Sequence, residues 1–440
     1  MTTAQTLPPT EPDGAPRLAS LDILRGIAIL GILFMNVNDM GQSFSNPDIR
    51  QLGWTVADRV AWWTRAILAD GTARGLLEML FGAGMVILTD RLAQMVDETL
   101  VRERYYWRNA VLWGFGIIHM FVLLWPGDIL HTYAVAALIA FGFRLMRPRA
   151  LIAIGLIAAT VQLGGAGFFG VYRPLQMQAE VTAASARRDA GIALDPAETT
   201  ILAASAKRAA SRAANIAANE AVIADENRAR SGSTLDWVGA QAEKSVERLG
   251  VSELVAIWEA VSTMLIGAAL FKLGILQGAR SRLFYSGLTV AAYAVGLPLR
   301  VLGAYEATRF TDAPQINWAT SEFARLATTL GHLGLIHLLL GTIIGARLLR
   351  PFAAAGRTAL TLYVLQTIVM LWILFPPFGL ALYGRLHWMP MMLVSVAVDL
   401  ALLWAANIYL RRFDIAPVEW AWRSIVARRR LPFRSVAAVS

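Results

Sequence analysis

Long apolar stretches, each of about 20 residues, recur along most of this chain and restrict its fold more than any other feature. An α-helix needs roughly that length to cross the hydrocarbon core of a bilayer. Proline-containing junctions such as Pro126-Gly127 and Pro376-Pro377 separate some of the stretches, and proline ends helices because it lacks an N–H group. We therefore predict about ten transmembrane helices, over residues 22–40, 71–89, 107–125, 129–146, 150–172, 252–276, 283–303, 322–347, 355–375 and 388–410.

The composition agrees with an all-α membrane protein. Of the 440 residues, 56% are hydrophobic and 16% are charged, whereas soluble domains carry about 25% charged residues. The chain has no cysteine, which excludes disulfides and thiolate metal sites. Its net charge is +9, but the arginines flank apolar segments and form no separate basic domain. We therefore expect no nucleic-acid partner.

The positions of the arginines predict the orientation. Arginine clusters precede the first predicted helix, follow the last, and lie between every second pair. With ten helices these clusters fall on one side, which the positive-inside bias makes cytoplasmic, so both termini are predicted to be cytoplasmic. Residues 50–74 carry arginines on the opposite side, and their pattern with Trp54, Trp62 and Trp63 predicts an amphipathic helix in the membrane interface.

The chain divides into five predicted parts. Residues 1–16 form a disordered tail, 17–173 a first half of five spans, 251–425 a second half of five spans, and 426–440 a basic tail. Between the halves, residues 174–250 are alanine-rich and charge-dense, with few large apolar side chains. We interpret them as an extracytoplasmic insert of two or three exposed helices, packed as a hairpin.

Two helix-start signals support helices in this insert. Asp195 precedes a proline and is followed by Glu198, and Ser233 is followed by Asp236 at the same spacing. In each case a short polar side chain caps the helix while an acidic side chain reaches back to the capping residue.

Ionisable residues inside the apolar stretches are candidates for function, because each costs about 2.5–3.5 kcal/mol to insert into a membrane. His119, in the third predicted helix, and Asp128, in the turn after it, form the most specific pair. A neutral imidazole can take a proton from an acceptor hydroxyl or amine, and a carboxylate can orient the ring. Alternatively, His119 bonds a backbone carbonyl of a neighbouring helix and Asp128 caps the fourth helix.

Five other residues are predicted to support a polar cavity: Asn36, Glu78, His131, His332 and His337. His332 and His337 lie about 140° apart around a helix, so a joint metal site is not expected. We predict no metal. For Glu78 the structural interpretation is an internal ion pair with Lys272.

Several sequence blocks resemble those of the YeiB-like family of bacterial inner-membrane proteins. The blocks are LDILRGIAILGI at 21–32, followed by Asn36; LFG at 80–82; GDIL at 127–130; and GRTALTLYVLQ at 356–366. The resemblance covers nearly the whole chain except the 174–250 insert. It implies a multi-pass protein of the bacterial inner membrane.

The first helix is also similar to those of the wider transmembrane acyltransferases, which include heparan-α-glucosaminide acetyltransferase and bacterial O-antigen acetylases. That resemblance implies acyl-CoA, such as acetyl-CoA, as a cytoplasmic donor and an extracytoplasmic glycan or lipid-linked molecule as acceptor. It implies that Arg25, with Arg357, binds the acyl-CoA phosphates, which guanidinium groups bind bidentately. Asn36 is implied to line the outer cavity and His119 to act as the base, beside Asp128.

This sequence departs from the acetyltransferase relatives at the residue that would act as the base. The acetyltransferase relatives carry a histidine shortly after the first helix, whereas residues 41–70 here contain none. We therefore assign the base to His119 or His332 by inference. Arg25 has a second interpretation, as a positive anchor at the cytoplasmic membrane surface.

The sequence thus predicts a membrane-bound acyltransferase whose partners are membrane lipid and the acceptor. The alternative is a transporter or exporter in which buried His, Asp and Glu side chains form a pathway. A homo-oligomer is left open.

Overall fold

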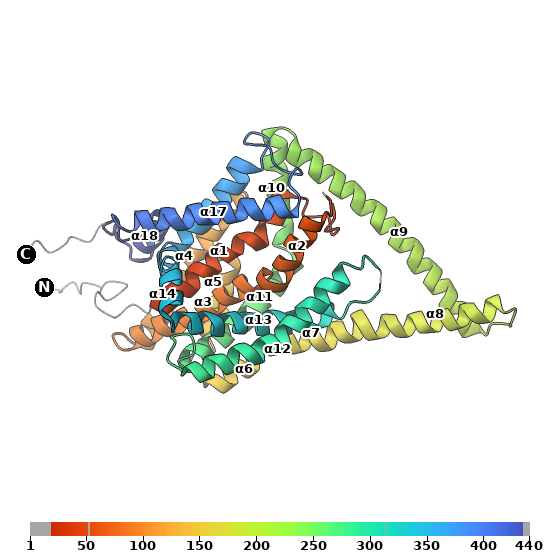
Figure 1. Ribbon diagram of the computed structural model, residues 1–440, viewed down its shortest axis with the longest axis horizontal. Coiled ribbons are helices and arrows are strands. Elements are labelled where there is room, and N and C mark those ends of the chain that lie inside the picture. The colour runs from red at the N-terminus through yellow and green to blue at the C-terminus, as the bar shows by residue number, and fades with distance from the viewer. Residues whose placement is uncertain (1–18, 52, 312, 434–440) are drawn as a thin grey trace, which may run out of the picture.

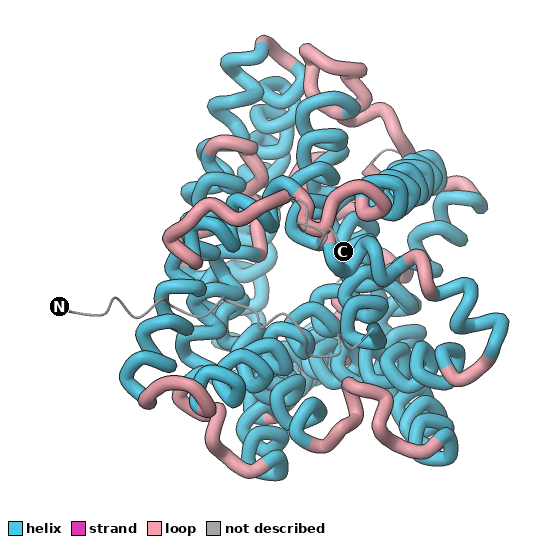
Figure 2. The backbone as a smooth tube through the Cα atoms, turned by 90° about the vertical axis from the view of Figure 1, so that its left-hand side faces the viewer, coloured by secondary structure: helices cyan, strands magenta, loops and turns pink. Residues whose placement is uncertain are grey.

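All regular structure in the described residues is helical, as the sequence predicts. The computed structural model describes residues 19–51, 53–311 and 313–433, so the predicted tail at 1–16 lies outside the described residues. Figure 2, in which many helices are seen end-on, shows helices joined by short loops and no strand in these ranges. The chain is a polytopic helical bundle.

The first half of the bundle begins with a long buried helix. Its elements are α1 (Ala19–Gly41), α2 (Val56–Thr64), the π-helix η1 (Arg65–Ala69), α3 (Thr72–Ala93), α4 (Glu98–Phe121), α5 (Leu130–Phe141), α6 (Pro148–Gly155), α7 (Ile157–Ala166) and the π-helix η2 (Gly167–Tyr172).

The predicted insert is helical and projects from the bundle. It contains α8 (Arg173–Asp189), α9 (Pro196–Ser231) and α10 (Thr234–Arg248). Figure 1 shows α8 extending away from the bundle and α9 returning from its tip to the opposite edge, so the two helices diverge and enclose an open wedge. Both predicted start signals are confirmed, because Asp195 with Glu198 and Ser233 with Asp236 form capping boxes.

The second half returns through the bundle. Its elements are α11 (Val251–Lys272), α12 (Arg282–Ala307), α13 (Asn317–Leu340), α14 (Ile343–Leu349), α15 (Phe352–Arg357), α16 (Ala359–Thr367), the π-helix η3 (Ile368–Leu374), α17 (Trp388–Tyr409) and α18 (Pro417–Val426).

Six helices of the described chain are long and apolar enough to cross a membrane, and two shorter ones, Leu130–Phe141 and Ala359–Leu374, are also apolar. Each predicted stretch overlaps a helix, and the total of about ten spans stays a prediction. The outer helices expose large apolar side chains, such as Val290 and Val295 on α12 and Leu400 and Trp404 on α17. A surface of this kind is suited to hydrocarbon.

Paired glycines bring the central helices into close contact. A Cβ atom at Gly26 of α1 would lie 1.9 Å from the Phe352 carbonyl oxygen, and one at Gly356 would lie 1.8 Å from that of Asp22. Because small residues let helix backbones approach closely in membranes, these two glycines fix α1 against α15. The first helix of the bundle thereby meets a short helix of the second half.

Candidate functional site

His119 and Asp128 meet at the end of α4. The His119 Nδ1 atom lies 2.7 Å from Asp128 Oδ1, and the two residues are only 1% and 3% exposed. The chain turns between α4 and α5, which brings the pair together. Gly116 leaves the room for it, since a Cβ atom there would lie 2.7 Å from Asp128 Oδ2.

Thr367 completes a row of three groups. Its Oγ1 atom lies 2.9 Å from His119 Nε2, on the ring edge away from Asp128. With the carboxylate ionised and the imidazole neutral, Nδ1 donates to Asp128 and Nε2 accepts the Thr367 proton. A hydroxyl, a base and a carboxylate that orients the base form the arrangement of an activated nucleophile.

Asp128 also holds a second histidine. Its Oδ2 atom accepts the backbone N–H of His131 at 3.0 Å and lies 2.8 Å from His131 Nδ1. The carboxylate therefore contacts the first turn of α5 as well as His119, and its catalytic role stays a prediction. The far nitrogen of His131, Nε2, lies 3.3 Å from Glu253 Oε1, at the start of α11. Short polar contacts thus connect four buried titratable side chains in the order His119, Asp128, His131 and Glu253.

A cavity of about 640 Å³ lies between α1, α3, α4 and the last helices, within the usual range of about 300–1,000 Å³ for ligand sites. Five arginines line it: Arg25, Arg91, Arg108, Arg357 and Arg423. Three carboxyl side chains also line it: Asp22, Asp414 and Glu419. The remaining wall is largely apolar, so the cavity combines a basic region with a slot for an uncharged chain.

The structure brings the two sequence-predicted arginines to this one cavity. Arg25 pairs with Asp22 at 3.0 Å, and the Arg357 Nη2 atom donates to the Asp414 carbonyl oxygen at 3.4 Å. Both lie at the end of the bundle that the positive-inside bias assigns to the cytoplasm. Arg91, Arg108 and Arg423 join them from α3, α4 and α18.

Tyr363 connects the cavity to the buried cluster. It lines the cavity, and its ring centroid lies 4.7 Å from that of His119. Its hydroxyl accepts the backbone N–H of Ile129, the residue after Asp128, at 3.1 Å. One side chain therefore contacts both the cavity and the base.

The insert covers the opposite side of the cluster. The Gln241 side chain donates to the Leu124 carbonyl oxygen at 3.0 Å, and the Ser245 hydroxyl donates to that of Met120 at 3.2 Å. Trp237 of the same helix, α10, packs against Trp372. Helix α10 thus seals the turn that follows His119.

Glu78 belongs to a separate charge network. Arg325 lies 2.9 Å from Glu78 and 2.5 Å from Glu322, and Arg74 lies 2.7 Å from Glu259. The predicted ion pair between Glu78 and Lys272 is wrong. Lys272 is the last residue of α11, and its ammonium group donates to the backbone carbonyls of Arg144 and Met146.

The remaining predicted residues lie elsewhere. The His332 Nδ1 atom lies 2.6 Å from the Tyr293 hydroxyl, and His337 stacks on Tyr285. Within the described ranges neither is bonded to His119. Asn36 is half-buried on α1 and is not among the residues that line the cavity.

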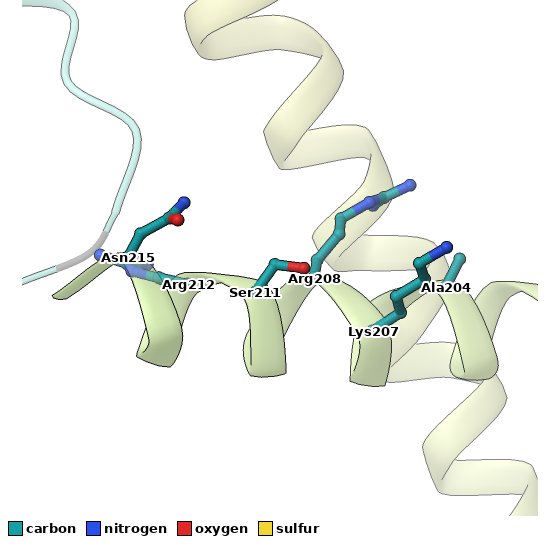
Figure 3. Close-up of a pocket in the computed structure, with 6 residues that line it drawn as sticks. All are labelled: Ala204, Lys207, Arg208, Ser211, Arg212 and Asn215. Carbon is teal, nitrogen blue, oxygen red and sulfur yellow. The ribbon is translucent and has the colours of Figure 1, made fainter. Parts of the chain in front are cut away.

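A second hollow, of about 400 Å³, lies on the projecting arm. Figure 3 shows that all six of its lining side chains come from α9, including Lys207 and Arg208. These residues lie on successive turns of one helix and are mostly exposed. The hollow is a surface feature of a charged helix, distinct from the buried cluster.

Three contributors to the cluster were not among the predicted residues: Tyr363, Thr367 and Glu253. Tyr363 lies inside the GRTALTLYVLQ block and Thr367 directly follows it. That block is therefore the one sequence signal that could have located them. Glu253 carries no comparable signal, because an acidic residue in the first turn of a helix is common.

These features define a class: a multi-pass helical membrane protein with a buried Thr–His–Asp row beside a basic cavity. Residues 270–429, which include Arg357, Tyr363 and Thr367, match the family described as "Protein of unknown function (DUF418)". The chain is similar to the YeiB-like family, as the sequence blocks indicated.

Two relatives match over nearly their whole length. "Uncharacterized protein YxaH" of Bacillus subtilis (strain 168) is 29% identical over 419 residues, which span 93% of this chain and 94% of that protein. "Uncharacterized protein YeiB" of Escherichia coli (strain K12) is 27% identical over 438 residues, spanning 94% and 98%. An "Uncharacterized 39.9 kDa protein in amylase 3'region" of Bacillus acidopullulyticus is 28% identical over 131 residues, spanning 28% and 35%.

Proposed function

We propose that this protein is an acyl-CoA-dependent acyltransferase of the bacterial inner membrane. It transfers an acyl group from cytoplasmic acyl-CoA, such as acetyl-CoA, to an extracytoplasmic or lipid-linked acceptor such as a glycan. The bacterial sources of the relatives support a bacterial protein, and the six long apolar helices support the membrane assignment.

The observation that carries the proposal is a cavity lined by arginines and by Tyr363, whose ring contacts His119. Arginine side chains at its mouth match the phosphates of a coenzyme A nucleotide, because guanidinium groups form strong, bidentate bonds to phosphate. The apolar wall, which includes Leu80 and Leu112, suits the uncharged arm that carries the thioester. Tyr363 at the inner end puts the base beside the position where that thioester would arrive.

His119 would supply the proton transfer. Its Nε2 atom can accept a proton from an attacking hydroxyl while Asp128 stabilises the charged ring. The burial of both residues excludes water, which favours transfer to the acceptor over hydrolysis of the thioester.

The test is acetyl-CoA binding and acetyl transfer by the purified protein in detergent or nanodiscs. We expect Arg357→Gln to weaken binding about tenfold or more, because a hydrogen bond to a charged group contributes about 1.5–3 kcal/mol. Arg412→Gln is the matched control, since Arg412 is exposed at the same end and is not among the cavity-lining residues. Equal binding by both variants, or no binding by the wild type, contradicts the proposal.

A transporter is the second candidate, and the buried charge network favours it. Glu78, Glu322 and Arg325 are each at most 5% exposed, and buried charges of this kind often line substrate or proton pathways. Substrate or proton flux into liposomes without acetyl-CoA turnover would support this candidate. Acetyl transfer without flux would exclude it.

A further inference from the structure

The position of the Thr367 hydroxyl points to a covalent step. We propose that Thr367 is the nucleophile of the reaction and carries the acyl group as an ester on Oγ1 between the donor and the acceptor. This inference rests on the proposed acyltransferase function and specifies its mechanism.

The hydroxyl lies closer to the base than to the backbone carbonyl of its own helix. Threonine inside a helix usually donates to the carbonyl four residues earlier, and Thr89, Thr328 and Thr329 do so here at 2.9, 2.7 and 2.8 Å. Thr367 lies 3.5 Å from the corresponding carbonyl of Tyr363 but 2.9 Å from His119 Nε2. Its hydroxyl is therefore directed toward the imidazole.

The order of the three groups is that of a catalytic triad. Thr367 Oγ1, the two nitrogens of His119 and the carboxylate of Asp128 follow one another at 2.9 and 2.7 Å. Activation of a hydroxyl nucleophile requires a base within hydrogen-bond reach and a third group that orients the base. All three side chains are buried, so an ester on Thr367 would be protected from water.

A covalent intermediate also fits the position of the site between two sides of the bundle. The arginine-lined cavity approaches it on the side of Tyr363, which lines the cavity and contacts His119. Helix α10 covers it from the other side, through Gln241 and Ser245. An acyl group held on Thr367 lets coenzyme A leave before the acceptor enters, so donor and acceptor need never share one open passage.

The proposed reaction has two successive acyl transfers, and His119 carries the proton in each. Thr367 Oγ1 attacks the thioester carbonyl carbon while its proton passes to His119 Nε2, the carbon–sulfur bond breaks, and the leaving thiolate takes that proton to give coenzyme A. The acceptor hydroxyl then loses its proton to His119 and attacks the Thr367 ester. The carbon–Oγ1 bond breaks, and the Thr367 alkoxide takes the proton back.

The experiment is isotope exchange without any acceptor. Purified wild-type protein is incubated with acetyl-CoA and labelled coenzyme A, and label entering acetyl-CoA is measured, because exchange requires a reversible acetyl-enzyme. In parallel, protein incubated with acetyl-CoA alone is digested and mapped by mass spectrometry. We expect exchange, together with one acetyl group on the peptide that contains Thr367.

Matched variants separate the nucleophile from a structural threonine. Thr367→Val keeps the shape but removes the hydroxyl, and we expect it to reduce exchange by on the order of 10⁶-fold, with acetyl-CoA binding unchanged. Thr367→Ser restores a hydroxyl and should retain exchange. Thr89→Val, at a buried threonine that donates to the Met85 carbonyl, should exchange like the wild type.

Different results would overturn the covalent step on Thr367 and the acyltransferase function. If the wild type transfers acetyl to an acceptor but shows no exchange, or if the Thr367→Val variant exchanges normally, Thr367 is not the nucleophile and the acyltransferase function stands. If the wild type neither binds acetyl-CoA nor transfers acetyl, the acyltransferase function is overturned and the covalent step with it.

Discussion

At the scale of single residues, His119 differs from His332, the other residue considered as the base, in its hydrogen-bond partners. It bonds a carboxylate and a hydroxyl, at Asp128 and Thr367. His332 instead bonds the Tyr293 hydroxyl and the Leu68 carbonyl. Both rings face a hydroxyl, but only His119 also has a carboxylate that can orient the ring and stabilise its charged form.

This difference gives a direct prediction. We expect His119→Gln to lower acetyl transfer by about 10²–10⁴-fold, the usual contribution of a general base, with little change in acetyl-CoA binding. His332→Gln should retain most of the activity while losing only its local hydrogen bonds. Initial rates of both variants, normalised to folded protein, measure this. Loss of activity in the His332 variant alone would transfer the role of base to that residue.

The sequence predicted part of this site because part of it is local. His119 and Asp128 are nine residues apart, so one turn between two helices brings them together. Thr367 is 248 residues away from His119, and that contact depends on how α16 packs against α4. The same limit explains the wrong partner for Glu78, because Arg325, its actual partner, lies 247 residues away.

At the scale of elements, a buried ion pair fixes the returning end of α9 to the end of α1. Arg230 donates to the carbonyl oxygens of Met40, in the last turn of α1, and of Gln42, just after that helix, both at 2.7 Å. Cations are favoured at helix C-termini, where the carbonyl groups have no helical partner. Glu226 pairs with Arg230 at 3.1 Å and accepts from the Ser43 hydroxyl at 2.7 Å.

The contribution of the Glu226–Arg230 ion pair, here called the anchor of α9, to stability should depend on pH. Burial raises the pKa of Glu226, but hydrogen bonds from Ser43 and the charge of Arg230 outweigh it, so the pKa lies below the usual 4.5. A carboxyl with a lowered folded-state pKa stabilises the fold above its unfolded value and loses this effect as the pH falls. We therefore expect smaller protection factors for amide hydrogen exchange at the end of α9 as the pH falls below 4.5, after correction for the intrinsic rate at each pH.

The anchor also predicts the effect of a neutral substitution. Glu226→Gln leaves Arg230 buried without its counter-charge, which costs about 3–5 kcal/mol in comparable pairs. The exposed pair Arg228–Asp225, with side chains 77% and 70% exposed, is the matched control, and Asp225→Asn should have little effect. Limited proteolysis of α9 should accelerate in the first variant only. Equal cleavage of both would contradict the anchor.

At the scale of the whole molecule, the sequence predicted the helical class because apolar stretches of span length leave few other folds. The course of α8 and α9 was not predictable in the same way. Capping residues mark where these helices start, but their divergence depends on contacts such as Arg230 with the end of α1. The fold class is thus a local property of the sequence, and the path of the insert is not.

The orientation of the bundle predicts a labelling pattern. The chain has no cysteine, so single cysteines can be introduced without a background. Ser211→Cys on the exposed arm should react with a membrane-impermeant maleimide in spheroplasts, whereas Met95→Cys, between α3 and α4, should react only after permeabilisation. Reaction of Met95→Cys in sealed cells would reverse the predicted orientation and separate the arginine cavity from cytoplasmic acyl-CoA.

The most direct test of the whole account is a cryo-EM map of the protein with a non-hydrolysable acetyl-CoA analogue. The account predicts nucleotide density against Arg25 and Arg357, with the acyl end beside Tyr363 and His119. A cavity that holds lipid instead, or nucleotide density anywhere else on the molecule, would contradict it.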